Sequence, residues 1–292
     1  MHAHPITASR RKPTTPSKVR DAYLSADTHP LWGQAPRWWA PRIVRAPYRA
    51  ALGSLITGAA IYTTGVLASY KAGTGQPWRS WPERTYLQYC EVCTRIEDFQ
   101  SQPFRADFIL DGSPATYLAD CIADRDDGTT VCSEVKAHFP LRGKWPFDIH
   151  RVAWANLREY RYARKLDAVG EILADLGIGF EIIVASRLHF PPAMVQNIDL
   201  VLRSRRITVE GRDLSIMARA LSAGHPVAFG SLSDALGGGP AATGKICALH
   251  ARRFLSIDFE SEIGPDSEVI PVIPRLGGRP VSMNSLWSRD DD

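Results

Sequence analysis

Cysteine, strong charge imbalance and long apolar runs are all scarce in this sequence, and each shortage excludes a class of protein. Five cysteines are scattered through 292 residues. This odd number argues against a disulfide framework and for reduced thiols in the cytosol. The pair Cys90-x-x-Cys93 has no second pair to complete a zinc site. Because it falls in a helical pattern, we expect both thiols to be buried.

The formal net charge of +4 is mildly basic and permits nucleic-acid binding without requiring it. The charge is uneven, since residues 1–50 carry nine Lys or Arg against two Asp. We predict that residues 1–50 are a basic, Pro-rich and largely disordered arm, whose end is fixed to the next domain by Trp38 and Trp39.

Residues 51–70 form the one stretch whose length approaches that of a membrane span. Three glycines and several Ser and Thr dilute it, so a hairpin or buried strand is the better interpretation. No signal peptide is visible at the N-terminus. We therefore expect a soluble, cytoplasmic protein that does not contact the membrane.

The most informative stretch is Tyr117–Lys136, which predicts two short strands joined at Asp126-Asp127-Gly128, because Asp-Gly is a strong hairpin signal. Side chains alternate along a strand, so Glu134 and Lys136 share one face, and Asp120 can lie near them. Two carboxylates at one sheet edge suit Mg²⁺ or Mn²⁺. The alternative is an ordinary solvated strand face.

The surrounding pattern predicts helix, strands, helix, strand over residues 81–186, within a domain at residues 51–190. Helical spacing runs through Trp81–Phe99, and a longer amphipathic pattern covers Arg151–Leu176 with Gly177 as its C-cap. Phe180–Ala185 has the composition of a buried strand. We expect an α/β domain whose sheet is covered by helices.

Residues 191–274 predict a second domain, beginning with a helix at 193–206. Three short helical segments and two extended stretches follow, which is the order of a winged helix. The third helix, 241–255, would be the recognition helix. Its polar residues are candidates for contacts with DNA or a partner: Lys245, His250, Arg252 and Arg253. The alternative is a small helical domain that binds protein. Residues 275–292 form a tail.

In this order, the motifs resemble the PD-(D/E)xK nuclease superfamily and, more narrowly, the TnsA endonucleases of transposons. The resemblance covers residues 65–272, and it departs from the family at Ala119, where a proline is usual. The matching segments are Gly65-Val66-Leu67-Ala68-Ser69-Tyr70-Lys71, Ser80-Trp81-Pro82-Glu83-Arg84, Gln102-Pro103, Tyr117 to Asp120, Glu134-Val135-Lys136, Gly179-Phe180 and Asn197.

This resemblance implies a restriction-endonuclease-like core, a mixed sheet flanked by helices, followed by a small winged-helix domain. It implies a Mg²⁺-dependent endonuclease that nicks DNA at transposon ends. The implied partners are a DDE-type transposase subunit and an AAA+ ATPase regulator. A stand-alone restriction or repair nuclease is one alternative, and a catalytically silent DNA-binding assembly factor is another.

The resemblance also implies roles for individual residues. Asp120, Glu134 and the Val135 carbonyl would hold the metal ion, and Lys136 would lie against the attacking water and the scissile phosphate. Glu83 would complete the acidic cluster. The remaining expectations are that Gln102 orients Glu83 or the phosphate, and that Ser69 and Lys71 contact DNA phosphates. The alternatives are helix capping and turn chemistry for Glu83 and Gln102, and ordinary surface positions for Ser69 and Lys71.

Overall fold

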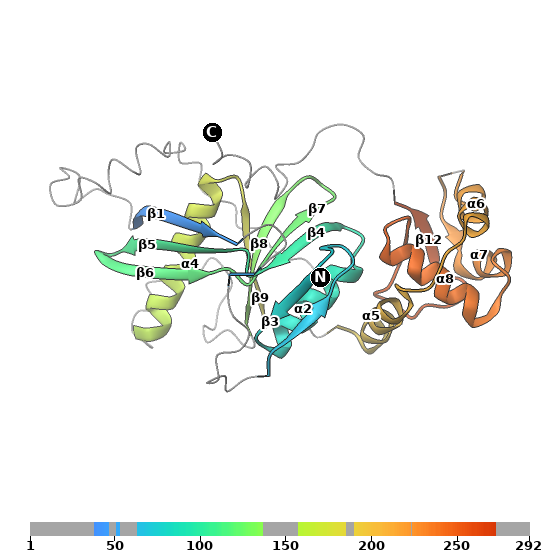
Figure 1. Ribbon diagram of the computed structural model, residues 1–292, viewed down its shortest axis with the longest axis horizontal. Coiled ribbons are helices and arrows are strands. Elements are labelled where there is room, and N and C mark those ends of the chain that lie inside the picture. Colours follow the sequence, from blue (N-terminus) through green and yellow to red (C-terminus); the bar gives the residue numbers. More distant parts are fainter. Residues whose placement is uncertain are drawn as a thin grey trace.

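The structure is a computed structural model that describes residues 38–46, 51–52, 63–136, 157–184, 190–222 and 224–272. Figure 1 shows its elements, with the central sheet in the middle and the C-terminal helices at one end. In chain order the elements are β1 (Trp38–Arg45), β2 (Gly65–Ala68), β3 (Gly75–Trp78), α2 (Trp81–Val92), β4 (Ile96–Ser101), β5 (Phe104–Leu110), β6 (Ser113–Leu118), β7 (Cys121–Arg125), β8 (Thr130–Lys136), α4 (Leu157–Asp175), β9 (Gly179–Val184), α5 (Pro192–Ser204), α6 (Gly211–Ala220), β10 (Val227–Ala228), α7 (Phe229–Ala235), α8 (Gly239–Ala251), β11 (Leu255–Ile257) and β12 (Glu268–Pro271).

The central sheet has the strand order β4-β7-β8-β9. Its first three strands are antiparallel neighbours, and β9 lies parallel to β8. One face packs on α2, where the Tyr86 hydroxyl lies 2.7 Å from Ser133 Oγ. The other face packs on α4, whose buried Leu166 shares a cluster with Cys132. The predicted α/β class is therefore confirmed.

The β7–β8 hairpin contains the predicted turn. Gly128 has a φ of 84°, which a glycine adopts without strain, and its N–H donates to the Arg125 carbonyl at 2.9 Å. The first strand of the hairpin was placed wrongly, however. It begins at Cys121, because Tyr117 belongs to β6, which lies in a separate sheet ordered β1-β5-β6.

The chain passes from the central sheet to the β1-β5-β6 sheet after β4, and it returns after β6. Between β4 and β5 the chain passes through Gln102-Pro103, and between β6 and β7 it passes through Ala119-Asp120. Pro103 has no N–H with which to continue a ladder. Gln102 has a φ of 47°, and its N–H donates to the Asp120 carbonyl at 3.0 Å. Asp120 therefore lies where the two sheets meet.

Helix α2 begins as predicted and ends earlier. The Ser80 side chain accepts the Glu83 N–H, and Pro82 occupies the first turn. The helix stops at Val92, and Ile96 is the first residue of β4, so the prediction of helix through Ile96 is wrong. Ile96 is buried in either conformation, which is why the apolar spacing misled.

Helix α4 buries four apolar residues of the predicted amphipathic pattern: Leu166, Val169, Ile172 and Leu173. Leu176 is 39% exposed and does not belong to that stripe. Gly177 has a φ of 75°, as expected for a residue that ends a helix. The part of the predicted helix at residues 151–156 lies outside the described residues.

The end of the N-terminal arm is a strand. β1 pairs antiparallel with β5, which gives Trp38–Arg45 a place in a sheet. Residues 1–37 lie outside the described residues, as does much of the apolar stretch at residues 53–62. The remainder of that stretch includes β2, which pairs with β3. No helix within the described ranges is long and apolar enough to cross a membrane.

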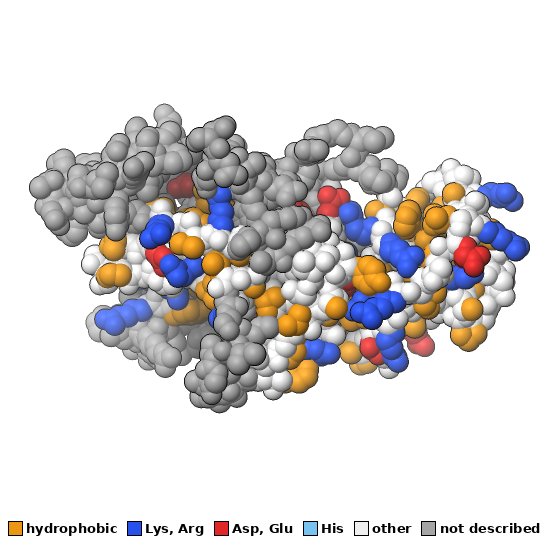
Figure 2. Space-filling model, in the orientation of Figure 1, with side chains coloured by type: hydrophobic (Ala, Val, Ile, Leu, Met, Phe, Trp, Pro, Cys, Tyr) orange, Lys and Arg blue, Asp and Glu red, His pale blue; other side chains and the backbone are white. Residues whose placement is uncertain are grey.

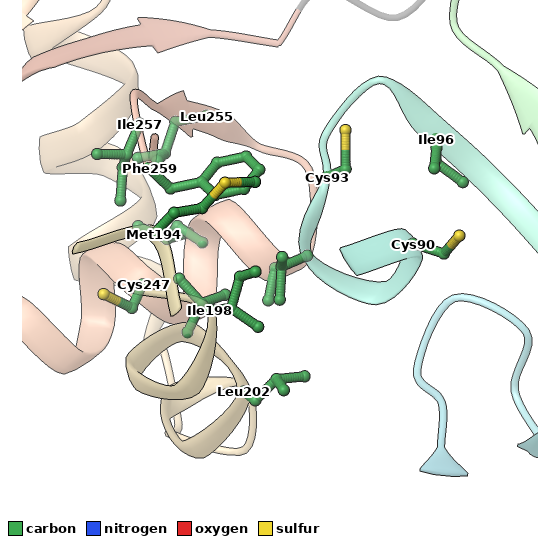
Figure 3. Packing of buried hydrophobic residues seen from close by; sticks show 14 of the residues in the cluster. Cys90, Cys93, Ile96, Met194, Ile198, Leu202, Cys247, Leu255, Ile257 and Phe259 are labelled. Atoms are coloured by element: carbon green, nitrogen blue, oxygen red, sulfur yellow. The ribbon is translucent and has the colours of Figure 1, made fainter. Parts of the chain in front are cut away.

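The C-terminal helices do not form a separate core. A single hydrophobic cluster joins α2 to α5 and α8, and Figure 3 shows Met194, Ile198 and Cys247 within it. The Tyr89 ring of α2 lies 5.6 Å from the Phe190 ring and 6.3 Å from the Phe259 ring. The predicted boundary near residue 190 therefore runs through a continuous interior.

The predicted recognition helix lies in this interior. From Ile246 to Ala251, every residue of α8 is buried. His250 is fully buried, and its Nε2 lies 2.9 Å from the Val92 carbonyl of α2. Packing against α5 and α2 covers the surface that a recognition helix would present to DNA, so that assignment was wrong for α8.

The other basic residues near α8 have partners within the chain. Lys245 Nζ lies 2.8 Å from Asp213 Oδ1, and Arg252 donates to the Ile207 carbonyl at 2.7 Å. Arg253 donates to the Thr94 carbonyl and to Glu97 Oε1, at 2.9 and 2.8 Å. These contacts tie the C-terminal helices together and to the end of α2.

Candidate metal and catalytic site

The structure brings together Asp120, Glu134 and Lys136. Lys136 Nζ lies 2.6 Å from Glu134 Oε1 and 3.8 Å from Asp120 Oδ2. The strand ladder explains this proximity, because Cys121 pairs with Ser133 and the next residues outward are Asp120 and Glu134. Two carboxylates and one ammonium group thus meet at the end of β8, beside α4.

Glu134 is held at one oxygen and free at the other. Its Oε1 accepts the Tyr162 hydroxyl at 2.7 Å as well as the Lys136 ammonium. Within the described part of the chain, its buried Oε2 has no hydrogen-bond partner. A buried carboxylate oxygen without a partner is costly. Glu134 Oε2 is therefore the atom of this site beside which a bound cation would be most stabilising.

The neighbouring negative charges also affect the pKa of Asp120. Burial raises its pKa well above the usual range, and the Glu134 and Glu83 carboxylates raise it further. Lys136 and the Val135 N–H, which donates to Asp120 Oδ2 at 2.8 Å, act in the opposite direction without cancelling the rise. A divalent cation between the carboxylates would relieve this repulsion.

Lys136 stays protonated at neutral pH. Burial lowers its pKa, but the neighbouring Glu134 and Asp120 carboxylates outweigh burial and hold the pKa above its usual value. Burial and the Glu134 charge likewise raise the pKa of the Tyr162 phenol. The pair consists of a permanent cation and a permanent hydrogen-bond donor.

Glu83 lies near enough for its charge to act on Asp120, but its carboxylate is already engaged at the start of α2. It accepts the Arg79 N–H at 2.8 Å and the Ser80 hydroxyl at 2.9 Å. The described residues contain no group of three or more His, Cys, Asp or Glu that could hold a metal ion. The predicted acidic trio is thus a pair with Glu83 beyond it.

Gln102 adjoins the site through its backbone, which donates to the Asp120 carbonyl. Its side chain is buried, and its Oε1 has no partner among the described residues. Neither of the Glu83 contacts in the structure involves Gln102, so the predicted link between them is not formed. The left-handed backbone of a buried Gln is strained, and such strain often accompanies functional sites.

Ser69 and Lys71, predicted to contact DNA, are used inside the chain. The Ser69 hydroxyl donates to Glu91 Oε2 at 2.6 Å. The Lys71 ammonium donates to the carbonyls of Cys90 and Cys93 at the end of α2, at 2.8 and 2.5 Å. Both residues thus hold α2 within the chain, and a contact of either one with DNA stays a prediction.

The residues present fit Mg²⁺. This ion keeps several water ligands and is usually held by one or two carboxylates together with substrate phosphates, rather than by a full protein cage. Asp120 and the free oxygen of Glu134 supply two such groups. The Val135 backbone meets the site through its N–H, while a role for its carbonyl as a ligand stays a prediction.

Two residues at this site were missed in the sequence. Tyr162 bonds to Glu134, and the Lys165 ammonium lies 5.1 Å from the centre of the Tyr162 ring. Both lie within the amphipathic pattern predicted for Arg151–Leu176, to which the sequence assigned no role at this site. The signal that could have found them is their separation by three residues, which places them on one helix face.

The predicted cysteine chemistry is confirmed in part. All five cysteines are free and buried, including Cys90 and Cys93.

Comparison with models of known protein families finds none that matches this chain, and no curated protein matches it. The functional argument therefore rests on the geometry of the site.

Proposed function

We propose that this protein is a metal-dependent DNA endonuclease of a transposition system, which nicks strands at transposon ends together with a transposase. The observation that carries this proposal is the buried, unpartnered oxygen of Glu134 beside Asp120 and Lys136. The helix–strands–helix–strand order around it agrees with the mixed sheet of the PD-(D/E)xK nucleases, and the Asp, Glu and Lys fall in that family's order.

Each residue has a role in phosphodiester hydrolysis. Asp120 and Glu134 would hold Mg²⁺ or Mn²⁺, which supplies an activated water and neutralises the phosphate. Lys136, a cation at neutral pH, would stabilise the negative charge that develops on the phosphate. Tyr162 holds Glu134 Oε1, which leaves Oε2 for the metal.

The C-terminal part supports a narrower claim than the sequence did. Three helices, α6, α7 and α8, with the antiparallel strands β10-β12-β11, suit a winged-helix-like unit. Since the C-terminal half of α8, Ile246–Ala251, is buried, we propose that this unit reinforces the nuclease core and binds a transposase or an ATPase regulator through other faces. The protein would bind DNA chiefly at the end of β8. Lys and Arg side chains lie over both halves of the face in Figure 2, which favours a polyanionic substrate.

The test is nicking of transposon-end DNA in Mg²⁺, with and without the partner transposase. We expect Asp120→Asn and Glu134→Gln to abolish nicking. Asp107→Asn is the matched control, because Asp107 is an acid of the neighbouring sheet already bound by Arg105. Nicking of any DNA without the transposase would favour the stand-alone nuclease. DNA binding without nicking under every condition would favour the assembly factor.

A further inference from the structure

Lys165 is a second cation at the candidate site. Its ammonium and that of Lys136 both lie within cation–π range of the Tyr162 ring, at 5.1 and 5.8 Å from the ring centre. The Lys165 charge acts on both Glu134 and Lys136. α4 thus adds a positive group to the sheet end where Asp120 and Glu134 meet.

The two lysines differ in what neutralises them. Lys136 has two carboxylates within 4 Å. Across the described ranges, Lys165 pairs with no carboxylate, and the bond it makes is a long one of 3.4 Å to the Thr116 carbonyl. A partly buried ammonium group without a counter-ion is unfavourable, and it favours the approach of an anion. Lys136 is already compensated, so Lys165 is the group with positive charge to spare.

We infer that Lys165 binds a backbone phosphate of the DNA strand that enters the candidate site. The inference rests on the proposed function, and it deepens it by naming a group that holds the substrate. Lys136 would act at the reacting phosphate, while Lys165 would hold a neighbouring one. A lysine acts on phosphate as a point charge, so the contact would be independent of base sequence.

The test measures binding of a duplex oligonucleotide at several salt concentrations, with a chelator present so that no cleavage occurs. For Lys165→Gln we expect several-fold weaker binding, and a salt dependence whose slope is smaller by about 0.9, the value for one phosphate contact. Lys165→Arg keeps the charge and should restore both. Arg164→Gln is the matched control, because its guanidinium is already paired with Asp111. Unchanged melting temperatures show that each variant is folded.

The outcomes separate this inference from the proposed function. An unchanged slope for Lys165→Gln overturns the inference, as does the absence of DNA binding by the wild type at low salt. If Asp120→Asn stops nicking while Lys165→Gln keeps the wild-type slope, only the inference fails. If the wild type never nicks but Lys165→Gln still loses a phosphate contact, the nuclease function fails and the phosphate site stands. In the nicking assay, Lys165→Gln should raise KM for DNA more than it lowers kcat.

Discussion

At the scale of single residues, Lys136 can have either of two roles. A lysine beside two carboxylates can simply balance their charge, or it can act on a substrate. Its distances of 2.6 and 3.8 Å from Glu134 and Asp120 suit either role. The two roles differ in what happens when the lysine is removed, since a metal ion can take over charge balance but not contact with the phosphate.

Replacing Lys136 with Met separates these roles. We expect the nicking rate to fall by a factor on the order of 10² or more, as when one preorganised electrostatic group is deleted. Binding of Mn²⁺ should be retained or become tighter, because a competing cation has gone. DNA binding should change by only a few-fold. Nicking within a few-fold of the wild type would remove Lys136 from the mechanism and with it most of the case for this nuclease family.

Asp120 gives a prediction about stability. Its folded-state pKa lies above the usual value of 3.8, so the folded protein binds the proton more tightly than the unfolded chain does. Stability therefore falls as the pH rises from 3.8 towards that raised pKa. Without metal at pH 7, Asp120→Asn should keep or raise the melting temperature, because the amide oxygen can still accept the Val135 N–H.

The melting temperature should be measured with and without Mg²⁺. The wild type should be stabilised by the ion through its binding to the folded state, whereas Asp120→Asn should lose that response. Asp107→Asn is the control, with a response to Mg²⁺ like that of the wild type. A large fall in melting temperature for Asp120→Asn would instead identify Asp120 as one half of a structural ion pair.

At the scale of elements, α2 connects the site to the C-terminal helices. Its first turn is held by Ser80 and Glu83, close to Asp120. Its last carbonyl groups accept bonds from Lys71 and from His250 of α8. Hydrogen-bond donors at a helix C-terminus satisfy its free carbonyls, and a cation such as Lys71 also complements the helix dipole. The orientation of α2 thus depends on residues from both ends of the described chain.

His250 makes this junction sensitive to acid. Burial lowers its pKa to about 4, with a further contribution from Lys71. Its Nδ1 accepts the Ile257 N–H at 3.0 Å, so the neutral ring donates from Nε2 to Val92. Between pH 6.5 and about 4 the unfolded chain binds the proton first, so stability falls as the pH falls through this window.

The shift corresponds to about 3 kcal/mol between the two ends of that window. We expect His250→Asn to be less stable than the wild type at pH 7 and to lose this part of the pH dependence. Urea unfolding of both proteins from pH 4 to 7 measures it, because the difference between them isolates one residue from the other titrating groups. Equal slopes of stability against pH would show that His250 is not the group responsible.

Features that depend on neighbouring residues were predicted better from the sequence than the points where the chain changes sheet or packs against a distant helix. The Asp-Gly turn and the face shared by Glu134 and Lys136 follow from neighbouring residues alone. The change of sheet at Asp120 does not, since the sequence pattern places Leu118, Asp120 and Ile122 on one face of a single strand although Leu118 and Ile122 lie in different sheets. Likewise, no residue of α8 shows that α5 and α2 will cover it.

At the scale of the whole molecule, the described residues form two hydrophobic clusters, and one of them extends across the predicted boundary near residue 190. The hydrophobic cluster runs from Leu87 and Cys90 of α2 to Ile198 of α5 and Leu249 of α8. Asn197, one of the residues that carry the family resemblance, lies within α5 and donates to the carbonyls of Phe259 and Ser261 at 3.0 and 2.6 Å. Its amide ties α5 to the segment that follows β11.

This shared interior predicts how the chain unfolds. Ile198 is buried in the cluster, as Figure 3 shows, and truncation of such a side chain costs about 2–5 kcal/mol. If both parts unfold as one unit, Ile198→Ala should lower a single melting transition and reduce hydrogen-exchange protection in α2 and β8 as well as in α5.

Val195→Ala is the matched control on the same helix, where the side chain is 52% exposed, and it should change stability by no more than about 0.5 kcal/mol. Two melting transitions, with protection lost in α5 and α8 alone, would show that the C-terminal helices unfold independently. The central sheet with α2 and α4 would then not depend on them for its stability.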